Sequence, residues 1–309
     1  MGLARTVAVL ATALAVACAA EWQPLSYKSG NLTILGILTR PPGPGPFPAV
    51  VVNHGGFAPA PVVLGLCRKF TEKGYVAAAS DYRGCGLSQG KHEMAKGEVD
   101  DVLALIEHLK TLAFVDAKRI VMIGESHGGA ITLLATARSP DVRAAVAVCA
   151  PSDLAKLCEH WKNMPLGAGL SHLKDALSHT GGTPEEVPDE YRIRSAITRA
   201  KDFRVPVLLI HGAKDALVPP AQSEAMLAAL KAAGKTAELK IVPNCGHVVP
   251  HAAYLDDALR WFEKAIGPAA KGARPADASK TRPVPPCLTS SPAAALPEVV
   301  RLGCAGAEG

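Results

Sequence analysis

Gly124–Gly129, with the sequence GESHGG, follows the apolar run Arg119–Ile123 and precedes Ala130–Ala135, whose composition is compatible with a helix. This is the pattern Gly-x-Ser-x-Gly between a strand and a helix. The turn needs glycines because a β-carbon beside the serine would collide with the adjoining strand or helix. The pattern predicts that Ser126 is an exposed nucleophile at the carboxyl edge of a sheet, facing the N-terminus of the next helix. A glycine-rich turn without chemistry is the alternative.

Around this segment, short β-branched or alanine-rich runs alternate with longer segments of helical period. This alternation is typical of a mostly parallel sheet covered by helices on both faces, an α/β fold. The predicted strands are an antiparallel lead-in strand, Leu32–Thr39, and then Ala49–Asn53, Val76–Ser80, Arg119–Gly124, Ala144–Cys149, Val205–Ile210 and Ala237–Val242. The predicted helices are Glu98–Leu112, Ser223–Ala233 and Tyr254–Ile266.

The helix Glu98–Leu112 illustrates the helical pattern. Its apolar face is predicted to consist of Val99, Val102, Leu103, Ile106 and Leu109. The charged residues Asp100, Asp101, Glu107 and Lys110 fall mostly outside that face. The segment is therefore expected to be a packed surface helix.

Two stretches depart from the alternation, one inside the predicted α/β-hydrolase domain, residues 21–266, and one after it. Residues 155–203 are rich in histidine, glycine and charge, and we expect a small helical cap over the site. Residues 267–309 consist largely of alanine, proline and glycine with few large apolar side chains. Such a composition buries too little surface to offset the entropy of ordering, which predicts a disordered tail.

The N-terminus has the layout of a secretory signal peptide, predicted to cover residues 1–20. Arg5 precedes the uncharged apolar run Thr6–Val16, and small residues follow up to Glu21. The run is too short to span a bilayer. We therefore expect a secreted or periplasmic protein, with a lipid anchor at Cys18 as the alternative because the preceding residues loosely resemble a bacterial lipobox.

Charge and cysteine usage exclude several classes of function. The formal charge is +5, without blocks of like charge or basic-aromatic interleaving, so no nucleic-acid partner is expected. None of the eight cysteines stands in a Cys-x-x-Cys pair, which leaves zinc-ribbon and thioredoxin functions without support. Cys149 lies in an apolar run and is predicted to be a buried free thiol.

A serine nucleophile requires a base, and the base requires an orienting carboxylate. Asp215 follows the strand predicted to end at Ile210, and His247 follows the strand predicted to end at Val242. Serine, then aspartate, then histidine is the chain order of α/β-hydrolases. We therefore predict Ser126, Asp215 and His247 as catalytic residues. The alternatives are a solvated or helix-capping role for the aspartate and His251 in place of the histidine.

Attack on a carbonyl creates an oxyanion that preorganised N–H groups must meet. The N–H of His127, next to the nucleophile, is the first predicted donor. The N–H of Gly56, in the segment HGGF that begins at His54, is the second, with Phe57 as its rival. His54 and His211 are expected to be structural, bonding neighbouring loops.

Together these residues resemble the catalytic domain of the prolyl oligopeptidase family, near its dienelactone hydrolase and acylaminoacyl-peptidase branches. The resemblance rests on His54–Gly56, Asp81–Gly84 with Gly86, Gly124–Gly129, Gly181–Glu186 with Arg194–Ser195, and the loops of Asp215 and His247. It implies an eight-stranded α/β-hydrolase sheet, the same catalytic triad and no cofactor. It also implies that Tyr82 and Arg83 support the site floor. With His54 and Phe57 they form the predicted substrate pocket.

Peptidases of this family usually carry a large N-terminal β-propeller. Here only about thirty residues separate the predicted signal from the first core strand, too few for one blade. We therefore expect a serine hydrolase acting on a small carboxylester, with a short-peptide substrate as the alternative. Two other hypotheses are a non-catalytic binding protein on the same scaffold and a metal-dependent hydrolase that uses the cap residues Cys158, His160, His172 and His179. We predict no metal site.

Overall fold

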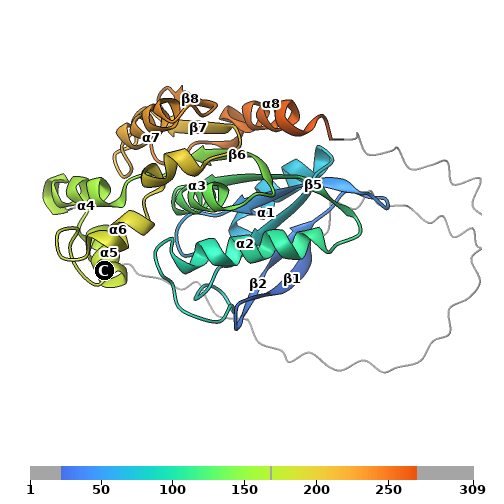
Figure 1. Cartoon of the computed structure of the whole chain (residues 1–309), viewed down its shortest axis with the longest axis horizontal. Coiled ribbons are helices and arrows are strands. Elements are labelled where there is room, and N and C mark those ends of the chain that lie inside the picture. Colours follow the sequence, from blue (N-terminus) through green and yellow to red (C-terminus); the bar gives the residue numbers. More distant parts are fainter. Residues whose placement is uncertain (1–21, 168, 270–309) are drawn as a thin grey trace, which may run out of the picture. The chain divides into compact units, whose positions relative to one another are not determined.

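A computed structural model describes residues 22–167 and 169–269 (Figure 1). Within these residues, eight strands form one sheet in the order β1-β2-β4-β3-β5-β6-β7-β8. The first two pairs, β1 with β2 and β2 with β4, are antiparallel, and all other pairs are parallel. The strands are β1 Gln23–Ser29, β2 Leu32–Thr39, β3 Phe47–Asn53, β4 Val76–Ser80, β5 Val115–Glu125, β6 Val142–Val148, β7 Val207–Gly212 and β8 Ala237–Val242. The predicted mostly parallel sheet is confirmed.

Helices cover both faces of the sheet, and each face has its own apolar core. The first core packs α2 (Gly97–Lys110), α3 (His127–Arg138) and α7 (Ala221–Ala232) against one face. The second packs α1 (Leu64–Glu72) and α8 (Leu255–Ile266) against the other. Because both faces are covered, β3 and β4 are buried at every position, which explains their continuous apolar sequences.

The segment between β6 and β7 forms the predicted helical cap, which lies at one end of the view in Figure 1. It consists of α4 (Leu154–Lys162), α5 (Leu170–Thr180) and α6 (Pro188–Ile193), with short 3-10 helices at Pro165–Gly167 and Ala196–Asp202. Two further 3-10 turns occur outside the cap, at Ala60–Val63 and His251–Ala253. Leu157, Trp161, Ala176 and Tyr191 form a small apolar cluster that holds the cap helices together.

The described structure differs from the predictions in several places. Strand β1 and helix α1 were not predicted. On α2, Leu105 is fully buried, whereas the predicted face residue Leu103 is only partly buried. Asp101, predicted to lie outside the apolar face, is fully buried because it pairs with Arg83. Helical periodicity does not reveal a charged partner elsewhere in the chain.

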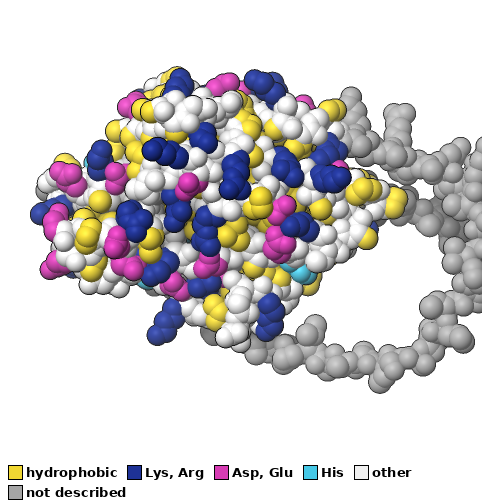
Figure 2. Space-filling model, viewed as in Figure 1, with side chains coloured by type: hydrophobic (Ala, Val, Ile, Leu, Met, Phe, Trp, Pro, Cys, Tyr) yellow, Lys and Arg dark blue, Asp and Glu magenta, His cyan; other side chains and the backbone are white. Residues whose placement is uncertain are grey.

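Several predictions concern residues outside the described ranges: the signal peptide, the lipid anchor at Cys18 and the C-terminal tail. Within those ranges, the five cysteines, including the buried Cys149, have free thiols. No helix there is long and apolar enough to cross a membrane. Figure 2 shows basic and acidic side chains interspersed on the visible face.

Candidate active site

Ser126 occupies a sharp turn between β5, a central strand, and α3. Its backbone has φ 53° and ψ −121°, a conformation that residues with a β-carbon rarely adopt. The neighbouring glycines leave no room for a side chain. A β-carbon at Gly124 would lie 2.2 Å from the Gly128 carbonyl oxygen, and one at Gly128 would lie 2.2 Å from the Asn53 carbonyl oxygen. Both glycines are therefore required for this turn.

Three loops at the carboxyl ends of β5, β7 and β8 bring Ser126, Asp215 and His247 together. His247 Nε2 lies 2.8 Å from Ser126 Oγ, and His247 Nδ1 lies 2.8 Å from Asp215 Oδ2. Both are hydrogen-bond distances. The rival histidine, His251, points elsewhere, because its Nε2 is 3.4 Å from Glu125 Oε1. The chain thus assembles the geometry of a nucleophile, a base and an orienting acid.

The Asp215 carboxylate is buried and bonded on both oxygens. Oδ1 accepts the backbone N–H groups of Leu217 at 3.0 Å and Val218 at 2.9 Å. Oδ2 lies 3.2 Å from His211 Nε2, in addition to its contact with His247. Burial alone would raise the pKa of Asp215, but the hydrogen bonds from His211, His247 and Val218 outweigh it and hold that pKa well below its usual value. Asp215 is therefore ionised at neutral pH.

His211 lies behind this carboxylate and is fully buried. Its Nδ1 is 2.7 Å from Ser223 Oγ, and its Nε2 is 2.8 Å from the Val218 carbonyl oxygen. Both ring nitrogens are thus committed, Nδ1 to helix α7 and Nε2 to the loop that contains Asp215. This environment matches the structural role expected for His211.

The two predicted oxyanion donors, His127 and Gly56, both lie in the wall of a cavity that also contains Ser126. Gly56 has φ +61°, and a β-carbon at Gly55 would approach the Ser126 β-carbon to 3.1 Å. The N–H groups of Gly56 and His127 make none of the backbone hydrogen bonds between loops of the described residues. Next to Ser126, these two N–H groups therefore make no hydrogen bond to another described loop.

This cavity has a volume of about 760 Å³ and extends from Ser126 towards the cap. Its walls are mostly apolar, with large contributions from Phe57, Met94, Leu154, Trp161, Leu217 and Val249. Of the four residues predicted to form the substrate pocket, Phe57 lines the cavity. His54, Tyr82 and Arg83 are not among the lining residues.

These three residues support the loops around the site. Tyr82 stacks on His54, with ring centroids 4.3 Å apart, and its hydroxyl donates to the His54 carbonyl oxygen at 3.3 Å. Arg83 binds both carboxylate oxygens of Asp101, at 2.9 and 3.1 Å, and Glu93 Oε1 at 2.9 Å. A guanidinium that is held by two acids is not available to a substrate. Because these partners lie far apart in the sequence, the local sequence pattern could not distinguish residues that support the loops from residues that line the cavity.

Charged groups in the cavity wall also have protein partners. Glu125 accepts a hydrogen bond from the Tyr254 hydroxyl and faces His251. Arg194, 4% exposed, binds Glu190 Oε2 at 2.5 Å and the Glu93 carbonyl oxygen at 3.1 Å. Arg194 thereby connects α6 of the cap to the loop before α2.

Sequence reasoning missed a cluster beside the nucleophile, formed by His92, Glu98 and the side chain of His127. Burial lowers the pKa of His127 to about 4, which keeps its ring neutral at pH 7. Burial opposes ionisation of Glu98, but contacts with His92, His127 and the Glu93 N–H lower its pKa to about 2. His92 and Glu98 belong to no sequence motif, although a histidine next to the nucleophile was a signal to search for partners.

The alternative metal site in the cap is not assembled. His160 Nε2 is 2.8 Å from the Ala216 carbonyl oxygen, and His172 stacks near Trp161. Among the described residues, no group of closely spaced metal-ligand atoms includes Cys158, His160 or His172.

Comparisons with known proteins agree with the fold. Residues 67–269 match the prolyl oligopeptidase family. The uncharacterized peptidase YtmA of Bacillus subtilis (strain 168) is 29% identical over 229 residues, covering 73% of this chain and 86% of that protein. A putative carboxymethylenebutenolidase of Escherichia coli (strain K12) is 26% identical over 246 residues, covering 71% of this chain and 78% of that protein.

Among solved structures, a puromycin-hydrolyzing peptidase of Mycobacterium tuberculosis superposes with a TM-score of 0.70 at 23% identity. The match covers 79% of this chain and 39% of that one, so the chain spans about two-fifths of that structure. At this identity the likeness shows the α/β-hydrolase fold alone.

The fold, the serine turn and these relatives define a serine hydrolase. More narrowly, the chain belongs to the prolyl oligopeptidase family, as the sequence motifs predicted.

Proposed function

We propose that this serine hydrolase cleaves carboxylesters through an acyl-enzyme formed on Ser126. The observation that carries the proposal is the pair of 2.8 Å contacts that link Ser126 Oγ, His247 and Asp215, with Ser126 and His247 in the wall of an apolar cavity. A serine, base and acid in this geometry suit acyl transfer.

In the proposed mechanism, Ser126 Oγ attacks the carbonyl carbon while His247 Nε2 takes the hydroxyl proton. The Asp215 carboxylate stabilises the resulting imidazolium. The oxyanion is met by the N–H groups of His127 and Gly56. His247 then protonates the leaving alcohol, and a water, activated by the same histidine, releases the acid and regenerates Ser126.

The cavity wall supports an uncharged, apolar substrate. Large apolar side chains favour burial of an alkyl or aryl group of the substrate. Each buried methylene contributes about 0.8 kcal/mol to the free energy of binding. A short peptide brings charged termini, which lose solvation in the cavity unless a free countercharge is present. Glu125 and Arg194 are already paired within the protein, and Asp175, the other acid in the cavity wall, has its Oδ1 3.3 Å from His179 Nδ1. These features favour an ester over a short peptide.

A matched substrate set tests the proposal. We expect p-nitrophenyl esters to be hydrolysed, with kcat/KM rising from acetate to hexanoate, while aminoacyl and blocked-peptide nitroanilides are cleaved much more slowly. Ser126→Ala should abolish ester turnover and retain the fold by circular dichroism.

Efficient anilide cleavage would instead support a peptidase, the alternative to which the name of the Bacillus relative points. Ester turnover that survives Ser126→Ala would overturn the mechanism. A folded wild-type protein without turnover on any substrate would favour the binding-protein alternative.

We also propose that the chain is exported. The proposal is supported by Arg5, the apolar run Thr6–Val16 and the small residues before Glu21. N-terminal sequencing of protein from a bacterial periplasmic or culture fraction should begin near Glu21. A lipidated N-terminus at Cys18 would support the anchored alternative, and an intact Met1 in the cytoplasmic fraction would contradict export.

A further inference from the structure

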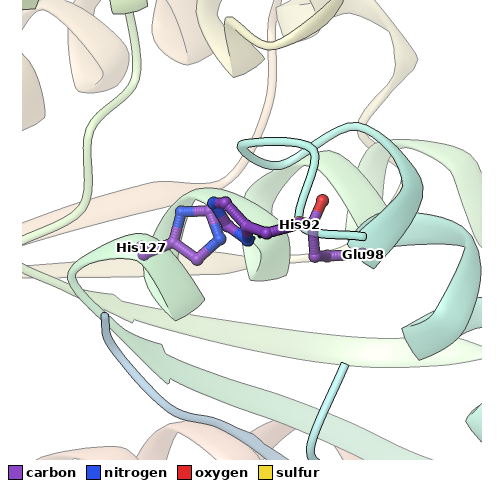
Figure 3. A group of neighbouring side chains, drawn as sticks. All are labelled: His92, Glu98 and His127. Atoms are coloured by element: carbon purple, nitrogen blue, oxygen red, sulfur yellow. Dashed lines mark ion pairs between the residues drawn. The ribbon is translucent and has the colours of Figure 1, made fainter. Parts of the chain in front are cut away.

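His92, Glu98 and His127 lie close together, and His127 directly follows Ser126 in the chain (Figure 3). His92 lies in the loop before α2, Glu98 lies in the first turn of α2, and His127 is the first residue of α3. One ring nitrogen of each histidine and one carboxylate oxygen all lie within 4.8 Å of one another. Three segments of the chain thus direct potential ligand atoms at one small region.

The histidines of this cluster have unused nitrogens. The Nε2 atoms of His92 and His127 are buried and have no hydrogen-bond partner in the described residues. Buried polar atoms in native proteins almost always have partners, so such atoms indicate a missing water or ion. Unpartnered nitrogens on two neighbouring rings of one cluster therefore suggest a bound ligand.

The carboxylate of the cluster is held in place. Glu98 is fully buried, and its Oε1 and Oε2 accept the N–H groups of Glu93 at 2.6 Å and Lys96 at 3.1 Å. Oε1 also lies 2.7 Å from His92 Nδ1, although the direction of the contact does not suit a hydrogen bond. Glu98 thus places a fixed negative charge beside the two rings.

Two imidazoles and one carboxylate are a donor set for zinc and similar divalent ions. Such ligands lie about 2.0–2.2 Å from Zn²⁺, so neighbouring ligand atoms in a tetrahedral site are roughly 3.3 Å apart. Modest side-chain rotations bring atoms within 4.8 Å to that spacing.

Two other groupings of potential ligands fit a metal less well. Cys149, His211 and Asp215 lie close together, but both ring nitrogens of His211 are committed. His179 and Asp175 approach His92 from the cap. However, His179 Nδ1 already lies 2.8 Å from the Asp175 carbonyl oxygen, and the Asp175 side chain is 32% exposed.

We propose that His92, Glu98 and His127 bind one divalent transition-metal ion of the Zn²⁺ class, with at least one coordination position left for water. Because His127 lines the cavity, the ion lies next to the substrate site and beside the predicted oxyanion donor. The site is distinct from the triad, and it was not expected from the sequence.

Direct binding tests the proposal. The protein is purified, freed of metal by dialysis against a chelator, and titrated with Zn²⁺ by calorimetry and with Co²⁺ by visible absorption. We expect one ion per chain and Co²⁺ bands typical of nitrogen and oxygen ligation. Because loss of one ligand removes a direct metal bond, His92→Gln and His127→Gln should each weaken binding by about tenfold or more.

Two variants serve as matched controls. His179→Gln tests the cap grouping, and His247→Gln tests metal binding at the triad. Both should keep the wild-type affinity within about threefold. Circular dichroism and thermal unfolding verify that each variant is folded, and either ligand variant alone suffices if the other does not fold.

Three outcomes would overturn the proposal: no stoichiometric binding by the wild type, unchanged binding in folded His92→Gln or His127→Gln, or loss of binding in His247→Gln. Loss in His179→Gln would likewise reject the assigned ligand set in favour of the cap grouping.

Discussion

Two regions near Ser126 each contain a pair of histidines, and they differ in how those histidines are bonded. On the Asp215 side, His247 and His211 use all their ring nitrogens in contacts with Ser126, Asp215, Ser223 and Val218. On the Glu98 side, His92 and His127 keep buried ring nitrogens without hydrogen-bond partners among the described residues. The first region is fully satisfied and therefore fixes one geometry, whereas the second retains capacity to bind a ligand.

Replacing the orienting acid is expected to give the largest effect on the satisfied side. Asp215→Asn should lower kcat for p-nitrophenyl esters by about 10⁴-fold, because a neutral amide does not stabilise the imidazolium and favours the wrong tautomer. KM should change little. Steady-state kinetics on the folded variant provide the measurement, and a loss of less than tenfold would show that catalysis does not depend on this carboxylate.

His211→Phe tests whether the support behind the acid matters. The variant leaves the Val218 carbonyl and the Ser223 hydroxyl without their buried partner, which should reduce the free energy of unfolding by about 2–3 kcal/mol. Misplacement of Asp215 should lower kcat by up to about 10²-fold.

Urea unfolding and the pH profile of kcat are the measurements. A positioning role predicts a changed pH profile, since His211 contacts the acid that orients His247. His251→Phe is the control, because His251 lies in the cavity wall and does not contact Asp215. An unchanged profile in a destabilised variant would limit His211 to stability.

Acidification offers a third test. The pKa of Asp215 is lower in the folded chain than its ordinary value of 3.8, so the folded state favours the ionised form. This contribution to stability is complete above that ordinary value and is lost as the pH falls through it towards the folded pKa. We expect the thermal unfolding temperature to fall more steeply below pH 4 in the wild type than in Asp215→Asn. Equal slopes would contradict this linkage.

The smallest effect is expected on the unsatisfied side. Without metal, His92→Gln should change the free energy of unfolding by less than about 1 kcal/mol, because His92 donates no well-directed hydrogen bond. The unfolding temperatures of the wild type and of His92→Gln are then compared with and without Zn²⁺. Metal should stabilise the wild type through binding to the folded state and should stabilise the variant much less. A large loss of unfolding free energy in the metal-free variant would contradict this contrast, because it would show that His92 makes stabilising contacts as His211 does.

Much of the fold could be predicted because the strands are strongly apolar. The predicted strands Val76–Ser80 and Ala237–Val242 have the observed bounds. Strand β1 was missed, although Leu25, Tyr27 and Ser29 alternate inward along it. Its remaining residues are polar or exposed, and it follows directly on the predicted signal segment.

The candidate site also contains residues that could be predicted from the sequence and residues that could not. Ser126, Asp215 and His247 each follow a predicted strand, so their proximity could be expected from the geometry of a parallel sheet. His92, Glu98 and Asp101 could not be assigned in this way. His127 lies 35 residues from its neighbour His92, and Arg83 lies 18 residues from its partner Asp101. Local periodicity contains no information about such pairs.

The contacts of Arg194 have a mechanical consequence. This side chain binds the Glu93 carbonyl oxygen from the cap, and Lys96 reaches Glu190 on α6 at 3.0 Å. Met94 and Ala95, between these two anchor points, line the cavity. Because these two contacts tie the segment to the cap at both of its ends, a displacement of α6 would also displace Met94 and Ala95 and would change the width of the cavity.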